Sequence, residues 1–174
     1  MLATRGSEAL ALLDEELVEY WLNNNGFFCM RGIKTGLGEI DFLAVRPSAD
    51  GFDCWHVEVQ VSFRPVGYLG GDTNAKKRSA EQLAEGIEQY IHKKFTSDSK
   101  VAKRESLLPN ADWKYKLVLA QLKDETEIGL LGERGIEVIR YDTVISELED
   151  GKSSVHSTAG NIVEILRYVR QRQQ

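Results

Sequence analysis

The sequence has little cysteine and no long uncharged apolar segment. Its two cysteines, Cys29 and Cys54, are too few for a disulfide framework and lack the spacing of a metal-ligand motif. Nowhere do about 18 uncharged apolar residues follow one another, and the first residues contain no apolar run of the kind found in signal peptides. We therefore expect a chain that is neither exported nor membrane-spanning and that works in the reducing cytoplasm.

The chain also lacks an excess of positive charge and the glycine motifs of nucleotide-binding proteins. Lys and Arg number 22 against 27 Asp and Glu, so the formal net charge is -5 and gives no general attraction for polyanions. No G-x-G-x-x-G follows a strand-like segment, and G-x-x-x-x-G-K-[ST] is absent, which argues against nucleotide binding. The 174 residues, 42% hydrophobic and 28% charged, predict one globular domain over 1–174.

The order of apolar patterns predicts an α/β fold with a mixed central sheet and helices on its faces. Apolar residues at three- and four-residue steps predict helices at 7–25, 75–95 and 159–172, and shorter helices are expected at 125–133 and 143–149. β-branched and aromatic residues predict strands at 27–30, 40–45, 55–61, 114–122 and 135–141. The polar stretch 96–112, which contains Pro109, is interpreted as an irregular connection. The core order is therefore helix, three strands, helix, strand.

Two of these strands carry an acid among apolar residues. Asp41 lies in the second predicted strand and Glu58 in the third, where it shares a face with His56 and Gln60. Burying an ionised carboxylate costs several kcal/mol unless a cation or hydrogen bonds compensate. If the two strands pair, about 4.8 Å apart, Asp41 and Glu58 converge on one face. A hard cation such as Mg²⁺ would relieve their repulsion, and metal-assisted phosphodiester hydrolysis is a natural use of such a site.

The two acids lie in the segments GEIDFLAV (38–45) and VEVQ (57–60). Together with the preceding helix, these segments resemble the PD-(D/E)xK, or restriction-endonuclease-like, nuclease superfamily, and most of all its Holliday-junction-resolvase-type members. The resemblance covers roughly 7–122, and 123–174 is expected to be a C-terminal extension packed on this core. It implies that Asp41, Glu58 and the main-chain carbonyl of Val59 bind the metal. Many members add a glutamate from the first helix, here Glu15, with Glu16 and Glu19 as alternatives.

The sequence departs from the family pattern at Gln60, where most members carry lysine. A glutamine can orient a water by hydrogen bonding, but it brings no positive charge to lower the pKa of that water or to stabilise the phosphorane. Glu-x-Gln forms occur among active members, so the resemblance still implies that Gln60 places the attacking water. The missing cation could come from Lys34, Arg64 or Lys76.

Basic residues concentrate just after the proposed active strand. Between 62 and 104 there are nine Lys or Arg against five Asp or Glu, a local surplus of four in a chain that is acidic elsewhere. A phosphate backbone needs neutralising charge of this kind. We expect the DNA-binding residues to be Lys34, Arg64, Lys76, Lys77 and Arg78.

The sequence thus predicts a Mg²⁺-dependent endonuclease, with Mn²⁺ as a substitute metal, that hydrolyses DNA phosphodiester bonds in structure-selective or repair-type cleavage. Asp41, Glu58, Gln60 and Glu15 are its catalytic candidates, and a homodimer is plausible because cutting two strands commonly takes two chains. The first alternative is an inactive nucleic-acid-binding or regulatory module of the same fold. The second is that Asp41 and Glu58 form structural ion pairs with Arg31 or Lys34.

Overall fold

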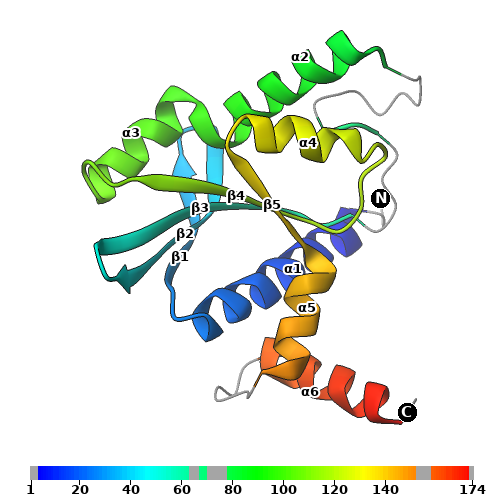
Figure 1. Cartoon of the computed structure of the whole chain (residues 1–174). Helices are drawn as coiled ribbons and strands as arrows, with labels where there is room; N and C mark the ends of the chain where they lie inside the picture. Colours follow the sequence, from blue (N-terminus) through cyan, green and yellow to red (C-terminus); the bar gives the residue numbers. More distant parts are fainter. Residues whose placement is uncertain (1–3, 63–66, 70–77, 152–157, 173–174) are drawn as a thin grey trace.

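The computed structural model describes residues 4–62, 67–69, 78–151 and 158–172, with side chains of the first helix described from residue 13 onward. Its centre is a five-stranded mixed sheet with the strands in chain order (Figure 1). The strands are β1 (Phe28–Thr35), β2 (Gly38–Ser48), β3 (Gly51–Gln60), β4 (Trp113–Leu119) and β5 (Ile136–Arg140). The first three pair antiparallel, whereas β4 and β5 are added in parallel. The predicted α/β class with a mixed sheet is confirmed.

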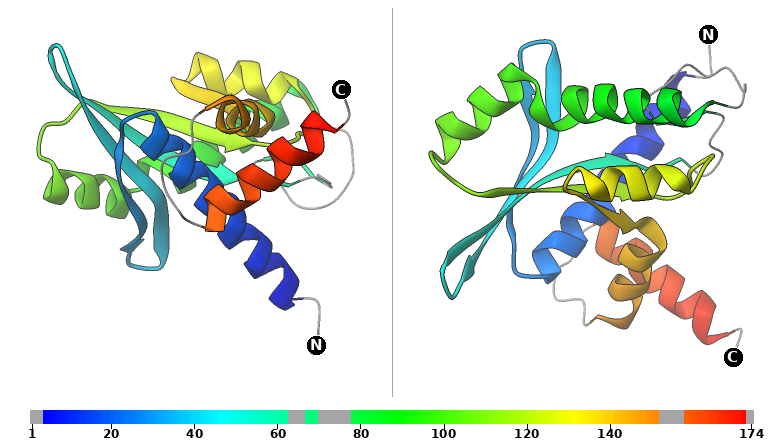
Figure 2. Two further views of the ribbon diagram at one scale, coloured as in Figure 1. Left: turned by 90° about the horizontal axis from the view of Figure 1, so that it is seen from below. Right: turned by 45° about the horizontal axis from the view of Figure 1, so that its top comes forward.

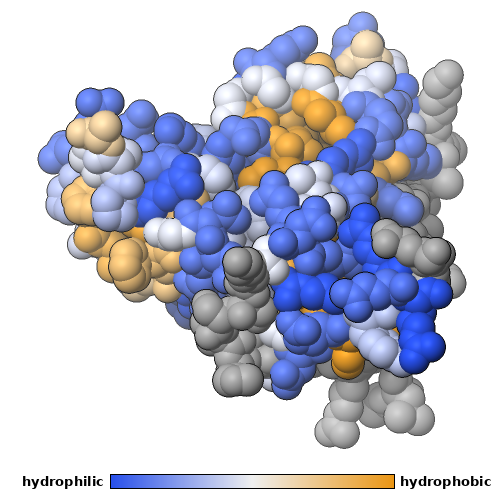
Figure 3. All heavy atoms as spheres, turned by 60° about the horizontal axis from the view of Figure 1, so that its bottom comes forward, coloured by the Kyte–Doolittle hydropathy of each residue, from blue (hydrophilic) through white to orange (hydrophobic). Residues whose placement is uncertain are grey.

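Helices cover both faces of the sheet (Figures 1 and 2). The helices are α1 (Thr4–Asn24), α2 (Ala80–Ile91), the π-helix η1 (His92–Thr96), α3 (Asp98–Leu107), α4 (Thr126–Glu133), α5 (Tyr141–Asp150) and α6 (Thr158–Gln171). One face packs on α1, α5 and α6, and the other on α2, η1, α3 and α4. Seen from the side of α1, α5 and α6, the surface is mostly hydrophilic with separate apolar areas (Figure 3).

Local sequence explains how α1 ends and leads into the sheet. Gly26 has a φ of 81°, a left-handed conformation that glycine adopts without strain. The N–H of Gly26 donates to the carbonyl of Asn23 at 3.0 Å, and that of Phe27 donates to Leu22 at 3.0 Å. These two bonds form a Schellman motif, and the helix ends within one residue of the predicted end at residue 25.

Helix α2 begins later than the sequence pattern predicts. Ser79 caps it through a capping box in which the Ser79 hydroxyl accepts from the Gln82 N–H at 3.3 Å and the Gln82 side chain accepts from the Ser79 N–H at 3.0 Å. Arg78, expected in the first turn of this helix, therefore precedes it. Residues 75–77 lie outside the described part of the chain.

The prediction of an irregular connection over 96–112 is wrong, because α3 occupies Asp98–Leu107. The buried residues of this helix are Lys100 and Arg104, four positions apart on one face. A helix whose inward face is charged has no apolar periodicity, which is why the pattern did not reveal it. No described helix has the length and apolar character needed to span a membrane.

Candidate functional site

The two strand acids lie side by side at the ends of β2 and β3. Phe42 of β2 pairs with Val57 of β3, so Asp41 and Glu58 are the next positions along the antiparallel strands and share one face. Asp41 Oδ2 accepts a hydrogen bond from the Val59 N–H at 2.8 Å. The predicted convergence of Asp41 and Glu58, called the acid pair below, agrees with this register.

Strand β1 places no side chain beside Asp41. Ile33 pairs with Ile40, so the preceding residue of β1, Gly32, lies opposite Asp41. Gly32 has a φ of 65°, and a Cβ at this position would meet Glu39 Oε1 at 3.3 Å. Any other residue would be strained here, and the neighbourhood of the Asp41 carboxyl stays free of a β1 side chain.

Glu58 is fully buried and bound by three nitrogen donors. Its Oε1 accepts from Lys100 Nζ at 2.6 Å and from His56 Nε2 at 2.9 Å, and its Oε2 accepts from Lys94 Nζ at 3.0 Å. Burial by itself raises the pKa of this carboxyl, but the hydrogen bonds from His56 and Lys100 and the charge of Lys94 more than offset it and hold the pKa below its usual value. Glu58 is therefore ionised at neutral pH.

His56 is buried behind Glu58 and is neutral. Burial is the main cause that lowers the pKa of its imidazole to about 4, although the contact with Glu58 acts in the opposite direction. Arg104 Nη1 lies 2.7 Å from His56 Nδ1. Because a guanidinium can only donate, Nδ1 must accept, and the ring proton must lie on Nε2, where it donates to Glu58.

The pKa of the Asp41 carboxyl is shifted in the opposite direction to that of Glu58. Burial raises the pKa of its carboxyl to about 7, and the negative charges of Glu58 and Glu15 add to this, whereas Lys94 and the Val59 N–H act against it. Asp41 therefore keeps its proton to a higher pH than an ordinary aspartate does. A cation that bound here would displace that proton.

Glu15 is the first-helix glutamate that shares the electrostatic environment of the acid pair. Burial raises the pKa of its carboxyl, the charges of Arg31 and Lys94 lower it, and those of Glu39 and Glu58 raise it again. Lys94 thus interacts with Glu15 as well as with Asp41 and Glu58.

The two alternatives to Glu15 face another part of the molecule. Glu16 and Glu19 line a cavity of about 440 Å³ between α1, β1 and the start of α6, together with Arg31. Glu19 Oε2 lies 3.0 Å from Arg31 Nη1. The charge of Glu15, in contrast, raises the pKa of Asp41, which ties Glu15 to the acid pair.

Gln60 and Val59 complete the residues that the sequence singled out on β3. Gln60 is exposed, and its Oε1 accepts from the Tyr90 hydroxyl of α2 at 2.7 Å. This bond orients the side-chain amide. Val59 contributes its N–H to Asp41, and its predicted role as a carbonyl ligand remains a prediction.

The cations found at the acid pair within the described residues, Lys94 and Lys100, are not ones that the sequence nominated. Lys34 forms an ion pair with Glu39 at the exposed β1–β2 hairpin. Arg31 pairs with Glu19, so the alternative in which Arg31 or Lys34 neutralises Glu58 is wrong: Lys94 and Lys100 do so. Glu39 is salt-bridged in the structure.

The remaining basic candidates are only partly described. Arg78 lies over the ring of Tyr68, with the guanidinium carbon 5.2 Å from the ring centroid. Arg64, Lys76 and Lys77 lie outside the described residues. Their contact with DNA stays a prediction.

Sequence reasoning missed Lys94, Lys100 and Arg104, which come from η1 and α3. The signal that pointed to them was indirect. A buried glutamate needs a cation, and Lys100 and Arg104 stand four residues apart, as residues on one face of a helix do. The interpretation of 96–112 as a loop hid this spacing.

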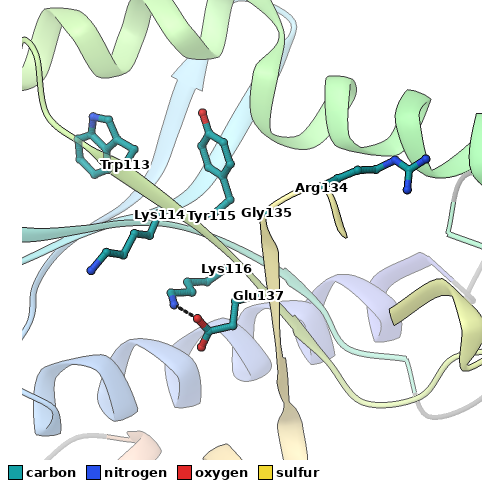
Figure 4. Close-up of a pocket in the computed structure, with 7 residues that line it drawn as sticks. All are labelled: Trp113, Lys114, Tyr115, Lys116, Arg134, Gly135 and Glu137. Atoms are coloured by element: carbon teal, nitrogen blue, oxygen red, sulfur yellow. Dashed lines mark hydrogen bonds and ion pairs between the residues drawn. The ribbon is translucent and has the colours of Figure 1, made fainter. Parts of the chain in front are cut away.

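A separate cavity of about 380 Å³ lies where β4 and β5 begin (Figure 4). Lys114 and Lys116 point to one side of the sheet there, and Trp113 and Tyr115 to the other. Lys116 forms an ion pair with Glu137. The lining of this cavity includes no member of the acid pair or its lysines, so we do not place the site there.

The acid pair offers the kind and number of ligands that Mg²⁺ commonly takes from a protein. These are hard carboxylate oxygens from one or two acids, with water and substrate phosphate completing the coordination. Across the described ranges no group of three or more His, Cys, Asp or Glu side chains is arranged to hold a metal ion. A metal would therefore depend on Asp41 and Glu58 themselves.

Comparison with protein-family models, curated proteins and solved structures finds no match for this chain. The class of protein is therefore defined by fold and site alone. It is a mixed α/β sheet that carries a cluster of two acids and two lysines at the ends of β2 and β3.

Proposed function

We propose that this chain is a metal-dependent endonuclease of restriction-endonuclease-like topology that hydrolyses DNA phosphodiester bonds at the acid pair. One observation carries the proposal: an ionised Glu58 and an Asp41 whose pKa is raised to about 7 lie on neighbouring strands beside the ammonium of Lys94. Perturbed carboxyls next to a lysine are a common feature of catalytic sites. A divalent cation would replace the proton on Asp41 and balance both charges.

Each residue of the cluster has a role in this proposal. Asp41 and Glu58 would hold Mg²⁺ or Mn²⁺, which when bound polarises the phosphate and lowers the pKa of water. Glu15 acts directly or through a water. Lys94 supplies the positive charge that Gln60 lacks, so it stabilises charge that develops on the phosphoryl oxygens. Gln60, oriented by Tyr90, helps to place the attacking water in line with the leaving oxygen.

DNA is proposed as the substrate because basic residues follow β3 in the sequence, although Lys100 and Arg104 of this stretch are buried and do not contribute to such a surface. Lys34, Arg64, Lys76, Lys77 and Arg78 are the proposed contacts to its phosphates, which position a duplex without reading its sequence. A homodimer would bring two such sites to the two strands.

The test is cleavage of supercoiled plasmid and of branched DNA in Mg²⁺ and in Mn²⁺. Asp41→Asn and Lys94→Met should each lower the rate about 100-fold or more, since each removes a charge that the transition state needs. Glu39→Gln is the matched control, because Glu39 lies on the same strand two residues from Asp41 but pairs with the exposed Lys34. Its rate should stay within about threefold of wild type. Absence of cleavage on every substrate, together with no heat of Mn²⁺ binding in calorimetry, would refute the proposal.

A non-catalytic nucleic-acid-binding module is the second candidate, and the engagement of Glu58 by three donors favours it. A glutamate neutralised in this way can be purely structural. This candidate predicts DNA binding that does not depend on divalent metal and is unchanged in Asp41→Asn, measured by fluorescence anisotropy.

A further inference from the structure

We propose that His56, Lys100 and Arg104, called the support group below, are positioning residues that direct one oxygen of Glu58, Oε2, toward the proposed reaction. The effect on catalysis rests on the proposed function, whereas the hydrogen-bond arrangement can be tested without it.

The two oxygens of Glu58 are in different surroundings. Oε1 accepts from both Lys100 and His56, and a carboxylate oxygen accepts about two hydrogen bonds, so Oε1 is saturated. Oε2 accepts from Lys94 among the described residues, which leaves it one further position. The Lys100 side chain is 4% exposed, but that of Lys94 is 27% exposed. Glu58 itself is fully buried, and the more exposed of its two lysines lies on the side of Oε2.

His56 is fixed in orientation and in tautomer. Its ring packs against Phe95, at a centroid distance of 5.0 Å, and against Tyr115, at 5.9 Å with the rings nearly perpendicular, and these two rings also contact each other at 5.4 Å. Arg104 donates to Nδ1 from one side, and Nε2 donates to Glu58 on the other. A neutral imidazole held in this way can serve only as a donor to Oε1.

Arg104 is buried with a set of neutral acceptors. Besides His56, its Nη1 donates to the carbonyl of Phe95 at 2.7 Å, and its Nη2 donates to the Tyr115 hydroxyl at 3.1 Å. Within the described residues Arg104 forms no ion pair with a carboxylate, and a chain of hydrogen bonds through His56 connects it to Glu58. A donor held by several hydrogen bonds in this way can keep the proton of His56 on Nε2.

The support group also determines where Lys94 stands. Lys100 Nζ donates to the carbonyl of Lys94 at 2.7 Å, and Arg104 donates to the next carbonyl, that of Phe95. Both carbonyls belong to the π-helix η1, and π-helical turns are frequent at functional sites. Helix α3 therefore holds Glu58 and the backbone that carries Lys94 in one rigid arrangement.

The experiment compares two replacements of His56. His56→Leu removes both ring hydrogen bonds, whereas the amide of His56→Gln keeps a donor near the position of Nε2. We expect His56→Leu and Lys100→Met to weaken Mn²⁺ binding at least tenfold in calorimetry, and to lower kcat at least tenfold with KM for DNA within threefold. His56→Gln should recover wild-type values to within threefold. Lys103→Met, on the same helix but outside the support group, is the matched control and should behave as wild type.

The tautomer is measured directly by the ring nitrogen shifts of His56 in the wild-type protein. Protonated Nε2 with unprotonated Nδ1 is expected, and the reverse would overturn the proposal even if His56→Leu failed to fold. A folded His56→Leu with wild-type Mn²⁺ affinity and kcat would also overturn it. If the wild type neither binds Mn²⁺ nor cleaves DNA, the proposed function fails. The hydrogen-bond arrangement of the support group is then still tested by the ring nitrogen shifts of His56 and by the carboxyl carbon shift of Glu58, which should change in His56→Leu.

Discussion

Both faces of β3 are buried, but different kinds of interaction stabilise them. On the side of α1, Val57 packs with Phe42 and Val18 in an apolar cluster. On the side of η1 and α3, His56 and Glu58 are equally buried but depend on hydrogen bonds and ion pairs with other elements. The apolar face is stabilised by removal of surface from water, whereas the polar face repays its desolvation only if every partner is present. Buried ion pairs of this kind add little net stability, so we interpret the polar face as a functional feature.

The largest effect should come from Glu58→Ala, which breaks the polar face. It leaves Lys94 and Lys100 without their carboxylate, so we expect a loss of about 3–5 kcal/mol in the free energy of unfolding together with loss of cleavage. Urea unfolding and plasmid cleavage measure the two effects. A stable Glu58→Ala with intact cleavage would show that the polar face has neither role.

The apolar face should respond in stability alone. Leu22 of α1 is fully buried, and Leu22→Ala should lower the free energy of unfolding by about 3 kcal/mol through lost burial and a cavity. Mn²⁺ affinity and cleavage, measured well below the unfolding midpoint, should equal those of wild type. A selective fall in Mn²⁺ affinity would mean that the two faces are coupled.

Asp41→Asn should stabilise the protein at high pH. The pKa of Asp41 is raised in the folded state, so the folded state holds a proton that the unfolded state has released between about pH 4 and pH 7. The protonated Asp41 carboxyl therefore does not destabilise the wild type below about pH 4, and the free energy of unfolding falls as the pH rises to 7. We expect Asp41→Asn to gain about 2 kcal/mol over wild type at pH 8, with the difference vanishing near pH 4.

Thermal unfolding across this pH range tests the sign. A gain that grew toward low pH would contradict the raised pKa. Cleavage by the wild type should rise with pH through about 7, as Asp41 loses its proton.

The smallest effect is expected at the surface. Lys34 is 77% exposed and pairs with Glu39, so Lys34→Gln should change the free energy of unfolding by less than about 0.5 kcal/mol. Weaker DNA binding at unchanged stability, measured by anisotropy, would support the predicted phosphate contact. Equal binding would remove Lys34 from that interface.

Much of the fold could be predicted because its apolar faces repeat with regular spacing. The strands around Asp41 and Glu58 were found in this way, and so were α1, α4, α5 and α6, with ends shifted by a few residues. Helix α3 could not be found, since its buried face consists of Lys100 and Arg104. Apolar periodicity reports which residues avoid water, and it is silent where charged side chains form the buried surface.

For the candidate site, the sequence predicted the acids and missed their partners. Asp41 and Glu58 stand out as acids in apolar strands, and the family resemblance adds Glu15 of the preceding helix. Lys34, Arg64 and Lys76 are the candidates that the sequence offers for the missing cation, and spacing alone assigns none of them. Lys94 is 36 residues from Glu58 in the chain, yet their side chains are 3.0 Å apart.

By itself the sequence determined the alternation of β2 and β3, and with it the placement of two carboxylates on one face, because side-chain direction in a strand follows from backbone geometry. Only the tertiary structure decided which charges surround them. Packing of η1 and α3 against the sheet keeps Glu58 ionised, whereas burial and the charge of Glu58 raise the pKa of Asp41. Electrostatic energy depends on distance through space, and no local pattern in the chain encodes the distance between elements that meet only after folding.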